Sequence, residues 1–359
     1  MIDRDDNRQW RQRIHGDGVS SSTETPISNS QSHRRAPTLE EECAPCELCI
    51  ALNTNGCYRY TFFVPARTWR FAMSSQVWRS VYHTIRMVNR SIPREGRRPT
   101  FPDTLIVAMY LWATFHDRPM CWAADRLNYS SCFRPRRLPS RSQFCRRIKS
   151  RRCNAILRAV FDRLGRSDDS GGGSLRLMDG RALRVQSHSK DPEATRGWAS
   201  GGFARGYKLH ALVNENERFL DIRVRSLNVS EKTVARELID ANRHVGFLLA
   251  DQGYESGSLY DYAAARGMTM MTPLKANAGK GHRPQSKARL HAKKLWRTHG
   301  RKLYDRRNAI ERYFGQLSAF GGGLAPLPPW VRRLERVERW VLAKVILYHA
   351  RLATKETAA

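Results

Sequence analysis

The chain has 359 residues, and its 63 Lys and Arg against 33 Asp and Glu give a formal charge of +30. This length excludes a single small binding module, because hydrophobic cores usually split beyond about 250 residues. The charge favours nucleic acid as the partner, since each basic side chain that neutralises a phosphate releases counterions; a solvated basic surface is the alternative. The first residues contain no secretory signal, and Lys344 interrupts the longest apolar stretch, so we expect a cytoplasmic protein without membrane contact.

Residues 1–70 are predicted to be an extension of the domains that follow. Residues 1–37 are polar and lack periodicity, which is typical of disorder. Four cysteines come next, at Cys43, Cys46, Cys49 and Cys57. Their spacing is compatible with zinc or an iron–sulfur cluster, but crowding without a nearby histidine favours a non-functional segment. In the absence of a secretory signal we expect all eight cysteines to be reduced.

Residues 75–167 are predicted to form a small helical domain. Between residues 102 and 150 the patterns TLIVAMYLWATF, CWAADRLNY and PSRSQFCRRIKSRR predict three short helices. Ser140 is the expected N-cap of the third helix, which carries Arg146, Arg147 and Lys149. A helix this basic after a short turn is typical of a helix-turn-helix, so we predict DNA binding or dimerisation here; a solvated basic face is the alternative. DDSGGGS at 168–174 predicts a hinge.

Residues 174–353 change to strand periodicity and predict a second, larger domain. SLRLMDGRALRV, KLHALV and LDIRVRSL indicate three consecutive antiparallel strands, followed by a helix over 231–242. A buried strand VGFLLA, a helix over 257–266, the strand MTMMTPL and a helix around residue 311 come next, and a last helix is expected over 331–352. This order predicts an α/β (α+β) fold of the ribonuclease H-like type, a mixed sheet with helices on both faces, preceded by the small all-helical domain.

Three acidic residues stand where this fold places functional groups. Asp179 lies within the first strand, where an ionised carboxylate needs a cation, although a salt-bridged Asp at a strand end is the alternative. Asp251 follows the buried strand FLLA, at the sheet edge where ligands bind in open α/β sheets, or merely opens the next turn. Glu311 lies on a helix that groups it with Tyr304, Arg307 and Ser318, at about 100° per residue; a solvent-facing Glu is the alternative.

The spacing of Tyr304, Arg307 and Glu311 resembles the signature around the catalytic glutamate of insertion-sequence DDE transposases. Asp251-Gln-Gly-Tyr is similar to their second-aspartate motif, and GYKLHALV at 206–213 resembles the strand that follows their first aspartate. The likeness covers about residues 174–353, and the helical block at 97–152 is more loosely similar. One departure is Ser318, which stands where the family has a lysine that contacts DNA phosphate.

The resemblance implies that Asp179, Asp251 and Glu311 bind two Mg²⁺ or Mn²⁺ ions and catalyse the cleavage and joining of DNA strands. Asp179 is expected to bridge both ions. The same resemblance implies that Tyr304, Arg307, Lys208 and His210 contact DNA, along with Arg146, Arg147 and Lys149 of the helical domain. Transposon ends and target DNA are then the partners, the working protein is expected to be a homodimer on DNA, and its location is the nucleoid.

Residues 275–302 are strongly basic, with Lys280, His282, Arg283, Lys287, Arg289, Lys293 and Lys294. We predict a DNA-contacting insertion, with a disordered basic loop as the alternative. Two other functions remain open. One is a metal-dependent nuclease that cuts without joining, and the other is a non-catalytic DNA-binding remnant of a transposase.

Overall fold

A computed structural model of the chain describes residues 74–94, 96–97, 99–166, 174–242, 245–274, 285–320, 323–324 and 326–356. The chain divides into two compact units, Met1–Pro65 and Ala66–Ala359, and all described residues belong to the second unit. The predictions for residues 1–70 and for Lys280, His282 and Arg283 therefore lie outside the described residues, as does all of the 168–174 hinge except residue 174. None of the described helices is long and apolar enough to cross a bilayer.

Four α-helices form the amino-terminal part of the described chain: α1 (Ser75–Ser91), α2 (Asp103–Phe115), α3 (Arg141–Ile148) and α4 (Arg151–Gly165). The helix α2 is buried on nearly all sides, as its apolar sequence predicts. Short 3₁₀ turns at Trp122–Ala124 and Arg126–Asn128 replace the predicted middle helix.

The predicted N-cap of α3 is present as a capping box. The Ser140 hydroxyl accepts a hydrogen bond from the Gln143 N–H at 3.3 Å, and the Gln143 side chain accepts from the Ser140 N–H at 3.1 Å. The continuous basic helix predicted through residue 152 is wrong, however. It ends at Ile148, and Ser150 caps α4 instead by accepting from the Cys153 N–H at 3.2 Å.

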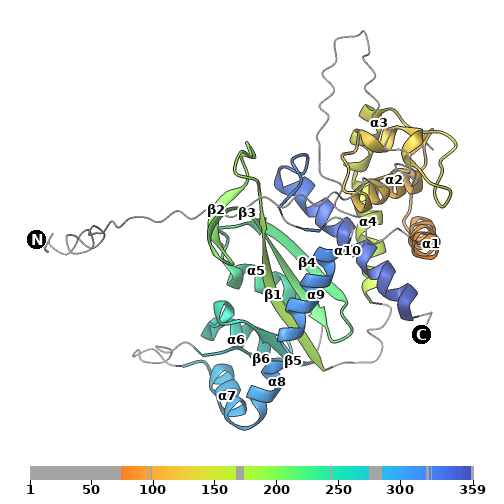
Figure 1. The fold of residues 1–359 in the computed structure, drawn as a ribbon. Helices are drawn as coiled ribbons and strands as arrows, with labels where there is room; N and C mark the ends of the chain where they lie inside the picture. The colour runs from red at the N-terminus through yellow and green to blue at the C-terminus, as the bar shows by residue number, and fades with distance from the viewer. Residues whose placement is uncertain are drawn as a thin grey trace, which may run out of the picture. The chain divides into compact units, whose positions relative to one another are not determined.

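A six-stranded mixed sheet forms the rest of the fold (Figure 1). Its strands are β1 (Leu175–Arg184), β2 (Thr195–Ala199), β3 (Gly202–Asn214), β4 (Phe219–Ser226), β5 (Gly246–Ala250) and β6 (Met268–Met271). The order is β2-β3-β1-β5-β6, with β4 paired to β3. The strands β1, β3 and β4 pair antiparallel as predicted, whereas β5 and β6 run parallel to β1. Strand β2 was not predicted.

Helices cover both faces of this sheet. They are α5 (Glu231–Asp240), α6 (Gly257–Ala264), α7 (Lys287–Leu295), α8 (Arg301–Asp305), α9 (Asn308–Ala319) and α10 (Leu334–Glu356). Neighbouring residues of β1 reveal the two faces, because side chains alternate along a strand. Asp179 contacts Arg307, just before α9, whereas a Cβ on Gly180 would point to Glu231 of α5. The chain thus has the predicted mixed sheet of a ribonuclease H-like fold.

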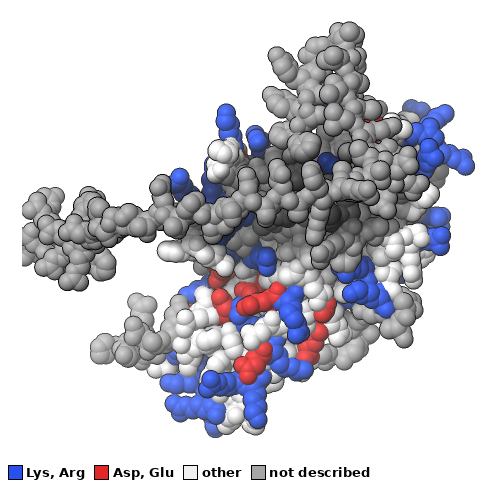
Figure 2. Space-filling view, in the orientation of Figure 1, with Lys and Arg blue, Asp and Glu red and all other residues white. Residues whose placement is uncertain are grey.

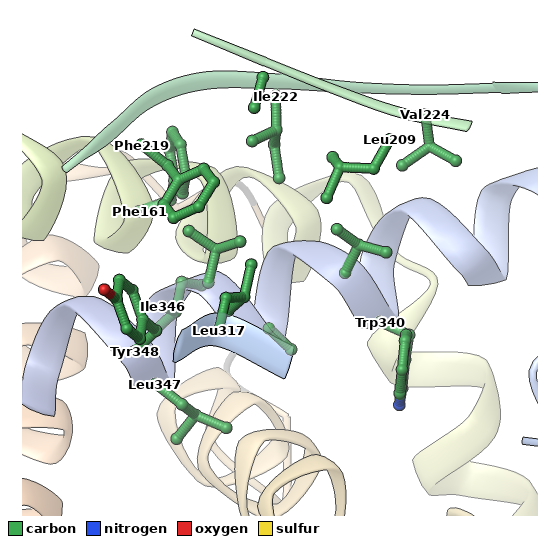
Figure 3. Packing of buried hydrophobic residues seen from close by; sticks show 14 of the residues in the cluster. Phe161, Leu209, Phe219, Ile222, Val224, Leu317, Trp340, Ile346, Leu347 and Tyr348 are labelled. Carbon is green, nitrogen blue, oxygen red and sulfur yellow. The ribbon is translucent and has the colours of Figure 1, made fainter. Parts of the chain in front are cut away.

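The helix α10 joins the sheet to the amino-terminal helices. It packs against β4 on one side and against α1, α2 and α4 on the other. In the close view, Phe219 and Ile222 of β4 face Ile346 and Tyr348 of α10, with Phe161 of α4 beside them (Figure 3). One hydrophobic core therefore runs through all described parts, and the division into domains at 75–167 and 174–353 stays a prediction.

Candidate active site

The pairing register places Asp179 and Asp251 side by side. Strands β1 and β5 are parallel, and Met178 is opposite Ala250 at the end of their paired segment. The next residue on each strand is an aspartate, and adjacent strands lie about 4.8 Å apart. Asp251 then caps the 3₁₀ turn Gln252–Tyr254, with its Oδ1 accepting from the Gly253 N–H at 2.8 Å. Two carboxylates thus meet at the carboxyl end of β5.

Arg307 connects this aspartate pair to Glu311. Its Nη2 lies 2.8 Å from Asp179 Oδ2, and its Nη1 lies 3.5 Å from Glu311 Oε1. The Arg307 and Asp179 side chains are 13% and 15% exposed, but that of Glu311 is 67% exposed. The predicted continuous helix through this segment is wrong, because a turn at Arg306 and Arg307 separates α8 from α9. Glu311 therefore lies in the first turn of α9, facing Arg307 rather than the aspartates.

A further carboxylate, Glu231, lies beside the two aspartates. It is the first residue of α5, and its Oε1 binds Lys208 Nζ at 2.8 Å. A Cβ on Gly253 would lie 2.3 Å from Glu231 Oε2 and 3.0 Å from Asp251 Oδ1. Glycine at residue 253 therefore lets both carboxylates approach the turn closely, since a side chain there would displace the Glu231 carboxylate.

The electrostatics of the site follow from burial and from this crowding. The pKa of Asp179 is raised to about 6, mainly by burial and in addition by the negative charges of Asp251 and Glu231, whereas Arg307 and the Gly180 N–H lower it. Burial alone would lower the pKa of Arg307, but the charges of Asp179, Tyr304, Asp251 and Glu311 raise it on balance. The guanidinium is therefore the positive charge that keeps Asp179 ionised near neutral pH.

Two tyrosines line the same carboxylates. Tyr254 is fully buried, and its hydroxyl has no hydrogen-bond partner among the described residues. Burial, together with Glu231, Asp179 and Asp251, raises its pKa well above the ordinary value. Tyr304 packs against Trp296 with ring centroids 5.1 Å apart, and burial likewise raises its pKa. Neither phenol ionises near neutral pH, so both can act only as neutral hydrogen-bond groups.

The other predicted DNA-contacting residues occupy three different environments. His210 is completely buried on β3, and Lys208 is paired with Glu231 and 14% exposed. Arg147 binds the buried Asp103, whereas Arg146 and Lys149 are exposed. DNA contact by these residues stays a prediction, and His210 has no exposed surface with which to make it.

The basic segment before Tyr304 is helical where it is described. Its residues 287–295 form α7, followed by a π-helical turn, Trp296–Gly300. Arg289 is 6% exposed and holds Glu255 at 2.7 Å, so it supports the fold rather than facing outward. At Ser318, the residue that replaces the family lysine, the hydroxyl is buried and has no hydrogen-bond partner within the described part of the chain.

The mixed sheet, with Asp179 within β1 beside Asp251 at the end of β5, has the architecture of a ribonuclease H-like fold. Residues 170–348 match the family model described as Transposase DDE domain, and with this match the chain belongs to the DDE transposases. The family's enzymes cleave and transfer DNA. Among solved structures, the chain is similar to a piggyBac transposase in a synaptic complex with hairpin DNA, with 9% identity, a TM-score of 0.38, and coverage of 79% of this chain and 74% of that chain. No curated protein matches the chain.

Divalent metal ions are general in this family. Carboxylate oxygens are the ligands that Mg²⁺ prefers, so the donor chemistry fits. Among the described residues, however, no three His, Cys, Asp or Glu side chains are gathered closely enough to hold one ion. The Arg307 guanidinium neutralises Asp179 in this arrangement, and the exposed Glu311 would have to turn inward to join the aspartates.

Sequence reasoning missed Glu231. Its only signal is its place directly after Ser230 at the start of a helix, which indicates a helix terminus and nothing about an active site. The contact with the Asp251 turn depends on how α5 packs across the sheet, which residue spacing does not reveal.

Proposed function

We propose that the chain is the transposase of an insertion sequence and that it catalyses metal-dependent DNA strand cleavage and strand transfer in cut-and-paste transposition. The observation that carries this proposal is the β1–β5 register, which pairs Met178 with Ala250 and so brings Asp179 beside Asp251. The Arg307 bridge supports Glu311 as the third acidic residue, since one guanidinium contacts both Asp179 and Glu311.

In this proposal Asp179 would bind both metal ions, and Asp251 and Glu311 would each bind one. Such ions, when bound, activate the attacking oxygen and stabilise the leaving oxygen at phosphorus. The protein's own side chains position the carboxylates and the DNA phosphate. Arg307 releases Asp179 and turns to a DNA phosphate, Glu311 moves toward the aspartates, and Glu231 keeps Lys208 beside the Asp251 turn. Water attacks a phosphorus at the element end, the bond from that phosphorus to the 3′ oxygen breaks, and the displaced oxygen takes up a proton to become the 3′ hydroxyl of the element. That hydroxyl then attacks a phosphorus of target DNA at the same site, where the bond to the target's own 3′ oxygen breaks.

DNA is the proposed partner because of the charge of the chain. Lys and Arg side chains are spread over the visible face, whereas Asp and Glu gather in a few places (Figure 2). A surface of this kind binds phosphates with strong salt dependence. Transposition joins two element ends, so we propose that two copies of the chain act together on DNA.

The test is cleavage of a supercoiled plasmid that carries the element's ends, with Mg²⁺ or Mn²⁺. The wild type is compared with Asp179→Asn, Asp251→Asn and Glu311→Gln, which keep the size of each side chain. Metal-dependent nicking that all three changes abolish supports the proposal, and joined plasmid products separate a transposase from a nuclease. An active Glu311→Gln variant would exclude Glu311 from the triad.

A second candidate is a non-catalytic DNA-binding remnant. The observation in its favour is the 67% exposure of Glu311, together with the serine at residue 318. A wild-type protein that binds the element's ends but leaves them intact with either metal would favour this candidate.

A further inference from the structure

The hairpin formed by β2 and β3 carries two large aromatic side chains that face solvent. Trp198 is 75% exposed and Phe203 is 64% exposed, although most aromatic residues of the described chain are buried. They are opposite each other in the β2–β3 register, with ring centroids 5.9 Å apart at 78°. An edge-to-face pair of this kind is preformed, because each ring holds the orientation of the other.

The base of the hairpin is fixed while its outer face is left uncovered. A Cβ on Gly197 would lie 2.6 Å from the Leu227 carbonyl oxygen, so the inner face lies directly on the neighbouring backbone. Arg205 donates to the carbonyl oxygens of Ala194 at 2.9 Å and Ser189 at 2.8 Å. The tip projects beyond the other strands of the sheet (Figure 1). A rigid support under an exposed aromatic pair indicates a binding element.

The charged side chains of the hairpin itself are all positive. Arg196 is exposed and lies two residues from Trp198, on the same face of β2. Arg184, at the end of β1, is also exposed, and its guanidinium donates to the Ser200 carbonyl oxygen at the tip. Residues 195–208 contain no Asp or Glu. Aromatic rings beside arginines match nucleic acid, whose bases stack on rings and whose phosphates pair with guanidinium groups.

The distance from the aspartates fits the same partner. Asp179 is opposite Ala211 of β3, and Phe203 lies eight residues from Ala211 on the same strand, which at about 3.3 Å per residue is roughly 26 Å. Because the spacing is even, Phe203 and Ala211 are on the same face of β3, and DNA with a phosphate at Asp179 would pass the aromatic pair about eight base pairs away, at about 3.4 Å per pair.

We propose that the β2–β3 hairpin is a DNA wedge, in which Trp198 and Phe203 insert against the bases of the element end about eight base pairs from the cleaved phosphate. This inference rests on the proposed function, which supplies DNA as the substrate. A wedge unstacks bases locally and holds the duplex in one position, so that the same phosphate is presented to Asp179 each time.

The test uses duplexes of the element end with 2-aminopurine at successive positions, in buffer with EDTA so that no strand is cut. The expected result with wild type is a rise in 2-aminopurine fluorescence confined to positions about eight base pairs from the cleavage site. Trp198→Ala combined with Phe203→Ala should abolish the rise and weaken binding about ten-fold, as expected for lost base stacking. Trp198→Phe should keep most of both signals. Val245→Ser, which changes an apolar residue that is 81% exposed and precedes β5, should behave as wild type.

Salt dependence distinguishes the aromatic from the basic contribution. The double alanine variant should lower affinity at every salt concentration without changing the slope of log K against log salt, whereas Arg196→Gln should reduce that slope by about one. Binding and fluorescence unchanged in the double variant would overturn the proposal. The proposal would also be overturned if the double alanine variant lost self-association in the absence of DNA, measured by sedimentation. That result would mean that the hairpin is a protein–protein interface. The fluorescence test does not depend on cleavage. A wild type that binds and unstacks DNA in this test, but does not nick the plasmid in the cleavage assay, would refute the proposed function while supporting the wedge.

Discussion

Arg307 and Asp179 are 128 residues apart in the chain and form an ion pair at 2.8 Å in which both side chains are largely buried. The guanidinium binds Asp179 Oδ2, while Asp179 Oδ1 accepts a hydrogen bond from the Gly180 N–H at 2.8 Å. It serves as an internal cation for the metal-free protein, and several measurable properties follow from that role.

Arg307→Gln should destabilise the metal-free protein by about 2–3 kcal/mol, because it leaves a buried carboxylate without its counterion. Added Mg²⁺ should then stabilise the variant more than it stabilises wild type, since the ion replaces the lost positive charge. Thermal unfolding with and without Mg²⁺ measures both effects. The neighbouring Arg306→Gln is the matched control, because Arg306 is 61% exposed and pairs with Glu215 at the surface. Equal Mg²⁺ responses in the two variants would refute this role for Arg307.

Gly253→Ala should impair the site through steric displacement, since the new methyl group would meet Glu231 Oε2 at 2.3 Å. We expect a stability loss of about 1–3 kcal/mol and weaker Mn²⁺ binding, measured by denaturation and calorimetry. Gly315→Ala provides the control: it lies within α9 with nothing within 4 Å of its Cβ position, so the change should stabilise the protein by about 0.5–1 kcal/mol. Adding Glu231→Ala to Gly253→Ala should recover part of the lost stability; no recovery would mean that the backbone, not Glu231, is displaced.

Two adjacent arginines of α3 should contribute to different properties: Arg147 to the stability of the fold and Arg146 to DNA binding. Arg147 binds Asp103, which is 4% exposed and also holds Arg152 at 3.0 Å and Arg94 at 3.4 Å. Arg147→Gln should therefore cost about 1–2 kcal/mol of stability. The exposed Arg146→Gln should leave stability within about 0.5 kcal/mol of wild type and reduce the salt dependence of DNA binding. Chemical denaturation and a salt titration separate the two, and a reversed pattern would contradict the structure.

The stability of the fold should decrease in mild acid because of His349. Burial lowers its pKa to about 3 from an ordinary value of 6.5, and its Nε2 accepts a hydrogen bond from the Phe219 N–H at 3.0 Å. Below pH 6.5 the unfolded chain binds a proton here that the folded protein does not, so stability falls as pH drops toward 3.

His349→Gln keeps an acceptor at a similar position but cannot titrate. Between about pH 6 and 4 its free energy of unfolding should fall less steeply than that of wild type, by about 1 kcal/mol per pH unit. His116 and His210, whose pKa values burial lowers to about 4 and about 3, remain in both proteins and give the shared background. If the free energy of unfolding fell equally steeply with decreasing pH in wild type and in His349→Gln, His349 would not be the cause of the acid sensitivity.

Much of the sheet and both aspartates could be predicted from the sequence, because strand alternation and buried apolar runs are local signals. Strand β2 was missed since TRGWA has no apolar alternation and is stabilised by β3 across a two-residue turn. The helix breaks before Arg151 and Asn308 were missed for a different reason. Helical periodicity in the sequence continues across a short turn. Ser150 and Arg307, which precede α4 and α9, are residue types found both inside helices and at helix ends, so they do not reveal the break.

The packing of α10 has a consequence for how the chain acquires its structure during synthesis. Its contacts with α1, α2, α4 and β4 connect segments that are made early to one that is made late. Neither the amino-terminal helices nor the sheet can complete its core until α10 has left the ribosome, and long-range closure of this kind slows folding. The apolar surfaces of α2 and β4 that α10 covers are therefore buried only at the end of synthesis.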